Sequence, residues 1–493
     1  MTPASQISTI AASAAPIPDQ PTLKKRWSRK VVSDLIAIAD LSAISVAAIL
    51  TAVGKGAPHG HGASFSLSGA ELCLLIVAAS HLTLREAGAY RAVLHTELRA
   101  SPLWLVTALL AAFVGTSVTV QAVAGPTAVS LSWLVFWFAA STAGLAIVRL
   151  TASGLLSSAV AKGKLRHHVG VFGAGRIADI VAAQARDPAS GIQLVGVFDD
   201  RQQVRQASSS RTSTSGNLES LIAMGRQDLL DEIVIALPQS ADCRITEIVR
   251  KLEHLPVKLS ICTHIAGELC GLSHPAQAVR SLGPLGLLDV KPRPLNDWAP
   301  FIKRLEDATI SGIALFLLAP VFLGIAIAIK RDSPGPVFFR QRRHGFNHRV
   351  FHVLKFRSMA VMEDGGKVEQ ARRADPRVTK VGRFLRRTSL DELPQLINIF
   401  LGDMSLVGPR PHAIAHNEHY ETVVDRYASR TQVKPGLTGW AQVSGFRGET
   451  RDTEAMRARV EHDLTYIENW SLWLDMRILV STLWCGFVHP NAF

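Results

Sequence analysis

The sequence lacks paired cysteines. Its five cysteines, Cys73, Cys243, Cys262, Cys270 and Cys485, are scattered through 493 residues without a C-x-x-C pair. This spacing excludes a disulfide framework and a structural zinc site, and it predicts reduced cysteines with structural roles. The chain also has neither zinc-finger spacing nor an RNP-like motif. No nucleic-acid partner is therefore expected, although the net charge is +13.

Charged residues are scarce. They make up 19% of the chain against 48% hydrophobic residues, and the mean hydropathy is +0.20. This composition is apolar for a soluble protein of this size. The cations flank apolar runs or gather in the C-terminal region, which favours a membrane protein facing the inner leaflet. The length suggests about two to four structural units.

Residues 1–30 are expected to form a disordered basic tail. Residues 1–23 are rich in Ala, Ser, Pro and Gln, and a basic run at 24–30 precedes the first apolar stretch. This run lies late for a signal peptide, and several more apolar stretches follow it. A retained first transmembrane helix with a cytoplasmic N-terminus is the better interpretation.

Four apolar stretches in residues 31–152 are long enough to span a membrane. They cover 32–53, 70–89, 103–124 and 131–151. The second is the weakest, because charged residues shorten its apolar core. The connections alternate between basic and nearly free of Lys and Arg, the positive-inside pattern. The pattern predicts a bundle of four transmembrane helices with both ends in the cytoplasm.

A nucleotide-type motif begins the next region, 167–290. A short apolar strand at 169–172 leads into the G-x-G-x-x-A motif that contains Gly173 and Gly175, and a second strand ends at Asp199. This is the dinucleotide fingerprint of a Rossmann-like α/β domain. No Tyr-x-x-x-Lys or other hydride-transfer group accompanies it. A structural or regulatory role is favoured, with a nucleotide-sugar-modifying oxidoreductase as the alternative.

A fifth apolar run covers 308–329 and carries Pro320 near its middle. Proline removes a helix hydrogen bond and bends the chain. Lys and Arg lie on both sides of the run, which favours two cytoplasmic ends. We expect a re-entrant helix kinked at Pro320. A fifth spanning helix with a tolerated proline is the alternative.

The C-terminal region combines cations with adjacent carboxylates. Lys355 and Arg357 belong to an Arg-rich pair of strand-like runs, whose density of cations suits a diphosphate or anionic lipid head groups. Asp391 and Glu392 follow Arg386 and precede a Leu-Pro-Gln-Leu segment. An isolated Asp-Glu pair is most often solvated surface. Here it stands among other distinctive motifs.

Those motifs carry a family resemblance. Residues from about 297 to 484 resemble the bacterial sugar transferases, the polyprenyl-phosphate hexose-1-phosphate transferases. The similarity rests on the Asp-Ser-Pro-Gly-Pro turn at 332–336, Leu-Asp-Glu-Leu-Pro-Gln at 390–395, Pro-Arg-Pro at 409–411 and Lys-Pro-Gly-Leu-Thr-Gly at 434–439. With the preceding helices and α/β region, the chain resembles the long form of the family. A membrane scaffold with an inert C-terminal half is disfavoured, because Asp391 and Glu392 are intact.

The resemblance implies roles for individual residues. Asp391 would be the nucleophile and Glu392 would hold Mg²⁺. Phosphate oxygens would be bound by four cations: Lys355, Arg357, Arg386 and Arg410. Asp463 and Asp475 match acidic positions of the family pattern, with roles left open.

The resemblance also implies the architecture and the partners. The expected protein is a multidomain membrane protein with a four-helix transmembrane bundle, a Rossmann-like cytoplasmic domain, and a mainly α catalytic domain at 297–493. Its substrates would be a UDP-sugar, with UDP-glucose preferred over UDP-galactose, and undecaprenyl phosphate. It would be a homodimer in the bacterial inner membrane, with the catalytic domain on the cytoplasmic face.

Overall fold

A computed structural model describes most of the chain. The described residues are 28–55, 69–90, 102–124, 130–161, 163–187, 190–201, 213–238, 241–263, 279–282, 285–360, 377–446 and 453–488. They form two compact units, one holding the N-terminal helices and the other holding nearly all of the α/β region and the C-terminal region. The predicted disorder of the tail falls almost entirely outside the described residues.

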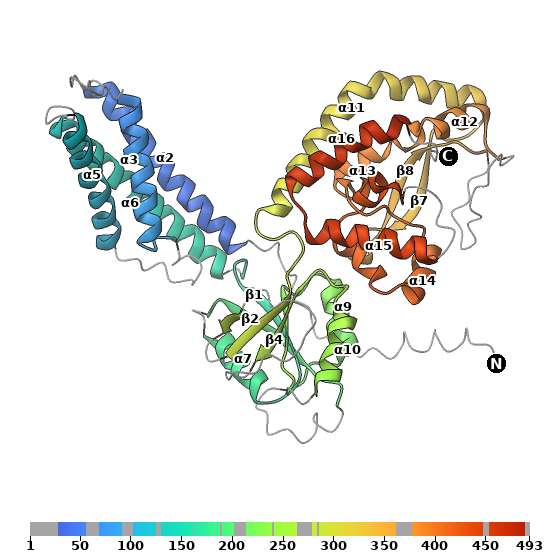
Figure 1. Cartoon of the computed structure of the whole chain (residues 1–493), viewed down its shortest axis with the longest axis horizontal. Coiled ribbons are helices and arrows are strands. Elements are labelled where there is room, and N and C mark those ends of the chain that lie inside the picture. Colours follow the sequence, from blue (N-terminus) through green and yellow to red (C-terminus); the bar gives the residue numbers. More distant parts are fainter. Residues whose placement is uncertain are drawn as a thin grey trace. The chain divides into compact units, whose positions relative to one another are not determined.

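Four helices form the N-terminal bundle (Figure 1): α2 (Arg29–Lys55), α3 (Gly69–Glu86), α5 (Pro102–Ala124) and α6 (Leu131–Ala161). Their outward side chains are apolar, as Leu50 on α2 and Leu150 on α6 show. Inside the bundle, Arg149 and Asp40 form an ion pair of 2.5 Å. The indole of Trp137 donates to the carbonyl of Ile44 at 3.0 Å. These contacts join α6 to α2.

Four described helices are long and apolar enough to cross a membrane. Three belong to the bundle, and the fourth is α11 (Ala299–Asp332) in the C-terminal region. The weakest predicted span is a helix, α3, but it has only 18 residues and carries charges at both ends. The membrane character of the chain is confirmed. The crossing by α3 and the loop orientation stay predictions.

The middle of the chain forms a mixed sheet of six strands in the order β2-β1-β3-β4-β6-β5. The strands are β1 (His167–Phe172), β2 (Ile192–Phe198), β3 (Glu232–Ile235), β4 (Lys258–Thr263), β5 (Val279–Leu282) and β6 (Leu285–Lys291). Strand β3 pairs parallel with β1 and β4, whereas β6 is antiparallel to β4 and β5. Helices α7 (Arg176–Arg186), α9 (Leu218–Arg226) and α10 (Asp242–Leu252) connect the strands. The sequence did not predict the antiparallel strands β5 and β6 at the edge of this sheet.

The C-terminal region follows α11. Its elements are β7 (Phe338–His344), η3 (Phe346–His348), β8 (Val350–Phe356), α12 (Lys380–Arg387), η4 (Leu390–Glu392), α13 (Gln395–Leu401), β9 (Ser405–Val407), α14 (Ile414–Val423), η5 (Tyr427–Gln432), β10 (Gly436–Thr438), η6 (Gln442–Phe446), α15 (Thr453–Glu468) and α16 (Leu472–Val488). The η elements are short helices. One apolar core joins β8, α13, β9, α15 and α16. Most of the described elements of the region are helices, in agreement with the predicted mainly α domain.

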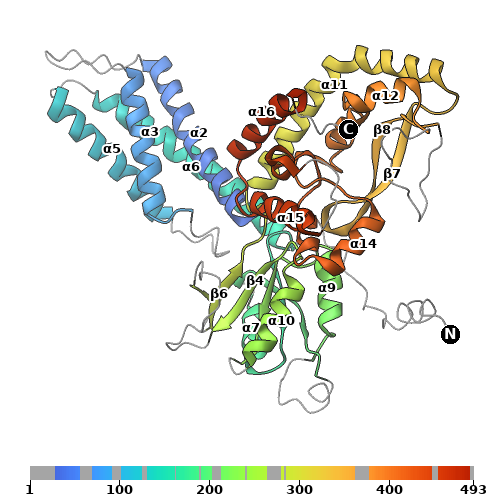
Figure 2. The ribbon, with the colours of Figure 1, turned by 45° about the vertical axis from the view of Figure 1, so that its right-hand side comes forward.

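Both ends of α11 are attached to this region. At its start, Arg304 donates to the carbonyls of Ile399 and Phe400 at 2.8 and 2.6 Å, and Asp307 accepts from the Leu406 amide at 2.8 Å. At its end, Ile329 is buried against Phe356 and Leu385. Between these anchors α11 exposes large apolar side chains, such as Phe316 at 81%. The helix bends along its length, as both ribbon views show (Figures 1 and 2).

Candidate active site

Asp391 and Glu392 lie in the short helix η4, in the link between α12 and α13. Thr379 caps the start of α12 by accepting from the Gly382 amide at 3.0 Å. Ser389 then takes a left-handed conformation with a φ of 55° and turns the chain into η4. Leu390 and Leu393 pack against the core formed by Ile325, Ile329, Phe356 and Leu385. The apolar flanks thus hold the two carboxylates in place.

Glu392 accepts hydrogen bonds from two cations. The Nζ of Lys355, on β8, and the Nη2 of Arg410, after β9, each lie 2.8 Å from its Oε1. Burial raises the pKa of Glu392, but Arg410 and Lys355 outweigh this effect and hold the pKa well below its usual range. Glu392 is therefore ionised at neutral pH.

Asp391 experiences the opposite balance. Burial and the charge of Glu392 raise the pKa of Asp391, while Lys355, Arg386 and Arg410 oppose the shift without cancelling it. A raised pKa makes the carboxylate more basic and hence a better nucleophile once it is ionised. The neighbouring carboxylates are thus pushed in opposite directions, the pattern that separates chemical roles within one site.

Arg410 is positioned where two sequence motifs meet. Strand β9 and its Gly-Pro-Arg-Pro continuation pair with β10: the Gly408 amide donates to the Thr438 carbonyl, and the Gly436 amide to that of Pro409, both at 2.9 Å. A Cβ on Gly436 would collide with the backbone of Gly408. Only glycine allows this approach, which explains why the Lys-Pro-Gly-Leu-Thr-Gly motif accompanies the Pro-Arg-Pro motif.

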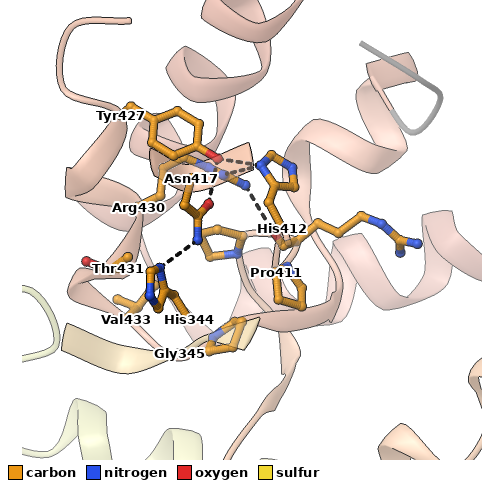
Figure 3. Close-up of a pocket in the computed structure, with 12 residues that line it drawn as sticks. His344, Gly345, Pro411, His412, Asn417, Tyr427, Arg430, Thr431 and Val433 are labelled. Carbon is orange, nitrogen blue, oxygen red and sulfur yellow. Dashed lines mark hydrogen bonds between the residues drawn. The ribbon is translucent and has the colours of Figure 1, made fainter. Parts of the chain in front are cut away.

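A pocket beside Arg410 contains a polar network (Figure 3). The buried Arg430 donates to the Arg410 carbonyl at 2.9 Å and approaches Nδ1 of His412 at 3.0 Å. Tyr427 hydrogen-bonds the same nitrogen at 2.6 Å and donates to Asn417 at 2.7 Å. Burial and then Arg430 hold the pKa of His412 well below its usual range, so the ring is neutral. The sequence offered no motif that would single out these four residues.

Arg357 has another task in the structure. Its guanidinium is buried and donates to the carbonyls of Ser333 and Pro334 at 2.6 and 2.5 Å, and to the Ser333 hydroxyl at 3.0 Å. It therefore holds the Asp-Ser-Pro-Gly-Pro turn at the end of α11. The predicted phosphate-binding role of Arg357 gains no support from this position. Lys355, Arg386 and Arg410, by contrast, all act on Asp391 electrostatically.

Asp463 and Asp475 form buried structural contacts. Asp463 accepts from Nε of Arg430 at 2.7 Å. Asp475 accepts from Lys303 at 2.7 Å, from the Tyr466 hydroxyl at 2.8 Å and from the Trp470 indole at 2.9 Å. Asp463 thus supports the network behind Arg410, and Asp475 anchors the start of α11.

A metal ion at this site would need ligands from the substrate as well as from the protein. Among the residues that the structure describes, no group of three His, Cys, Asp or Glu side chains could hold a metal ion. Mg²⁺ commonly binds one or two carboxylates together with substrate phosphates and water. Glu392 would contribute the protein's carboxylate to such an arrangement, and its Oε1 is the atom that accepts from Lys355 and Arg410 in this structure.

The glycine loop of the α/β region is internally engaged. Gly173 has a φ of +112°, and a Cβ there would clash with the Ala236 carbonyl. The Ala174 amide donates to Oδ2 of Asp199 at 2.8 Å, and the Arg201 amide donates to Oδ1 at 2.9 Å. Ribose hydroxyls would have to compete for this carboxylate. These residues therefore do not present a ready site to a nucleotide cofactor.

Adjacent carboxylates among cations, in a region with an exposed apolar helix, fit an enzyme that transfers a charged group at a membrane. The family described as bacterial sugar transferase matches residues 298–489, and a CoA-binding domain matches residues 85–262. The chain belongs to the bacterial sugar transferase family.

Relatives extend the match beyond the catalytic region. A UDP-glucose:undecaprenyl-phosphate glucose-1-phosphate transferase of Xanthomonas campestris is 38% identical over 72% of this chain and 73% of its own length. The Escherichia coli protein of that name is 37% identical over 73% of this chain and 76% of its own. An exopolysaccharide production protein of Rhizobium leguminosarum is 48% identical over 39% of this chain, which covers 98% of that protein.

Proposed function

We propose that the protein transfers glucose 1-phosphate from UDP-glucose to undecaprenyl phosphate and releases UMP, as the first membrane step of exopolysaccharide or O-antigen assembly. The observation that carries this proposal is the Asp391–Glu392 pair beside Lys355, Arg386 and Arg410. The two long relatives support the choice of substrates, because their names state this reaction. UDP-galactose, the alternative donor, is not favoured by these names.

The proposed chemistry has two displacements. An oxygen of Asp391 attacks the sugar-bearing phosphorus of the UDP-sugar, and the bond from that phosphorus to UMP breaks. An oxygen of undecaprenyl phosphate then attacks the same phosphorus and releases Asp391. Arg410, Arg386 and Lys355 bind the phosphate oxygens and offset the charge that builds up. Bound Mg²⁺, held by Glu392, would screen the diphosphate against the anionic nucleophile.

A panel of nucleotide sugars tests the donor. Membranes containing the protein are incubated with undecaprenyl phosphate, Mg²⁺ and UDP-glucose, UDP-galactose or UDP-N-acetylgalactosamine in turn. We expect UMP release and a lipid-linked sugar with UDP-glucose. The third donor matters because an Aeromonas hydrophila relative named for it is 43% identical over 183 residues. Transfer from UDP-galactose alone would contradict the proposed donor while leaving the enzyme class intact.

We infer that α11 is re-entrant and that the catalytic region lies on the cytoplasmic face of the inner membrane. A straight helix of 34 residues would be about 51 Å long and would separate its ends by more than a bilayer core. Both ends of α11 instead pack on one compact region, and the helix contains Pro320 and bends. The attachment of both ends to one region supports re-entry. The cytoplasmic supply of UDP-sugars supports the side.

The topology can be tested by labelling in intact cells. A cysteine introduced at Gly365, in a variant without the native cysteines, should resist an impermeant maleimide added from outside and react after the membrane is opened. A matched cysteine in the bare connection at residue 127 should react from outside. External labelling at position 365 would contradict re-entry, because it would place the segment after α11 outside.

We propose that the α/β region is Rossmann-like and serves a regulatory or structural role. The parallel strands β1, β3 and β4 and the glycine loop support the fold assignment. The engaged Asp199 favours a role other than redox chemistry. The homodimer stays a prediction.

A further inference from the structure

The α/β region contacts the catalytic region through the ends of two helices. The side-chain amide of Asn347, in η3, donates to the carbonyls of Gly225 and Arg226 at the end of α9, at 3.2 and 2.6 Å. The Gln432 side chain, at the end of η5, donates to the carbonyl of Glu253 just after α10, at 2.8 Å. The last carbonyls of a helix lie beyond its regular hydrogen-bond ladder, and that of Gly225 also accepts from the Asp228 amide at 3.1 Å. Asn347 and Gln432 supply partners from another part of the chain.

An ion pair strengthens the same contact. Arg426, directly before η5, lies 2.7 Å from the Glu253 carboxylate. Lys291 fixes the other side of this segment by donating to the carbonyls of Glu253 and Leu255 at 2.5 and 2.7 Å. The segment after α10 is thus bonded on one side by Lys291 and on the other by Arg426 and Gln432.

The backbone at the contact is strained. Asn347, His348 and Arg426 have φ values of 54°, 59° and 58°. Such left-handed conformations cost free energy for residues other than glycine, and they persist only where the surroundings hold them. The docked α/β region supplies part of that surrounding structure through Asn347 and Arg426.

The same short helix reaches the active site. Arg426 directly precedes η5 and Gln432 is its last residue, and both contact Glu253 of the α/β region. Tyr427, at the start of η5, and Arg430, inside it, line the pocket instead, and Arg430 donates to the Arg410 carbonyl. Arg410 in turn donates to Glu392. A six-residue element therefore connects the α/β region to the catalytic carboxylates.

We propose that docking of the α/β region on η3 and η5 sets the position of Arg410 and thereby the rate of sugar-phosphate transfer. The α/β region is then a regulatory input to the active site, with Asn347, Arg426 and Gln432 as positioning residues. This inference rests on the transferase activity proposed above. A change at the end of α10 reaches Arg410 through η5.

The test breaks the contact in the full-length protein without touching the site. The variant Arg426→Gln/Gln432→Glu removes the Arg426–Glu253 pair and sets a carboxylate against the Glu253 carbonyl. It also removes the 2.9 Å pair of Arg426 with Glu468 on α15, so Glu468→Gln, which breaks that second pair alone, should retain wild-type values. We expect kcat/KM for UDP-glucose to fall about tenfold, within the usual range of coupling between sites, with an unchanged KM for undecaprenyl phosphate. The control Arg457→Gln breaks an exposed Arg457–Glu454 pair of 2.8 Å on α15 and should retain wild-type values.

Two further measurements separate this coupling from general damage. Hydrogen exchange should rise at the end of α10 while the core around Ile399 stays protected. In an Arg410→Lys background the double variant should cost about twofold or less, because contacting or coupled residues are not additive. The proposal would be overturned if hydrogen exchange rose at the end of α10 while turnover stayed at the wild-type rate. A full tenfold loss in the Arg410→Lys background would also overturn it. An inactive wild-type protein would instead count against the proposed function.

Discussion

Replacing Asp391 by asparagine is expected to abolish turnover. The amide has nearly the shape of the carboxylate, so η4 should keep its fold, but an amide is a poor nucleophile. We expect a loss of more than about 10³-fold in kcat, as for other enzymes that lose their nucleophile. Incubation with UDP-glucose labelled in the sugar should place the label on wild-type protein without any lipid, and leave Asp391→Asn unlabelled.

Glu392→Gln is the matched control for this experiment. This variant also replaces a carboxylate by an amide, but it leaves the nucleophile Asp391 in place. It should therefore still take up label, and it should need a higher Mg²⁺ concentration to do so. It also weakens the contacts of Lys355 and Arg410, which donate to Glu392. A wild-type enzyme that never takes up label, yet turns over readily once lipid is added, would establish direct displacement in place of the covalent route.

Replacing Asp463 by alanine is expected to destabilise the catalytic region by about 3–5 kcal/mol. Asp463 and Arg430 are both buried, with side chains 3% and 5% exposed, and Arg430 lies near Arg410 and Arg459. Removing one partner of a buried pair leaves an uncompensated charge, which is the costly case. A lowered midpoint of thermal unfolding in detergent would measure the effect.

Glu454→Ala provides the comparison on the same helix. Glu454 pairs with Arg457 on the exposed face of α15, and such a pair contributes at most about 0.5 kcal/mol. Equal unfolding midpoints for the two variants would refute a structural role for Asp463. If Asp463→Ala then lost turnover as well, its carboxylate would belong to the chemistry.

The partners of Arg357 could not be predicted from the sequence. Alternation along a strand would place Lys355 and Arg357 on one face, and both were predicted to bind phosphate. Strand β8 ends at Phe356, however. Arg357 therefore turns to the carbonyls after α11, while Lys355 reaches Glu392. Two cations of the same charge, two residues apart, therefore have different partners in the structure, which strand alternation alone does not predict.

The sequence by itself determined the features that depend on neighbouring residues. Long apolar runs and flanking cations predicted the membrane helices, because a bilayer selects for length and hydropathy alone. The glycine loop and the adjacent carboxylates of Asp391 and Glu392 could be found for the same reason, since each motif is contiguous. The antiparallel strands β5 and β6 were not predicted, although Gly283-Pro284 between them is a turn signal in the sequence. A turn signal shows where the chain reverses, but it does not show which edge of the sheet the two strands join.

Only the tertiary structure decided which distant side chains meet. Arg410 pairs with Glu392 because β9 and β10 align two glycine motifs, and Arg430 reaches the Arg410 carbonyl from η5. The buried charges of Asp463 and Asp475 acquired partners 33 and 172 residues away in the chain. Burial makes an unpaired charge costly, but it does not say which opposite charge will come near. That choice depends on packing, which no local pattern encodes.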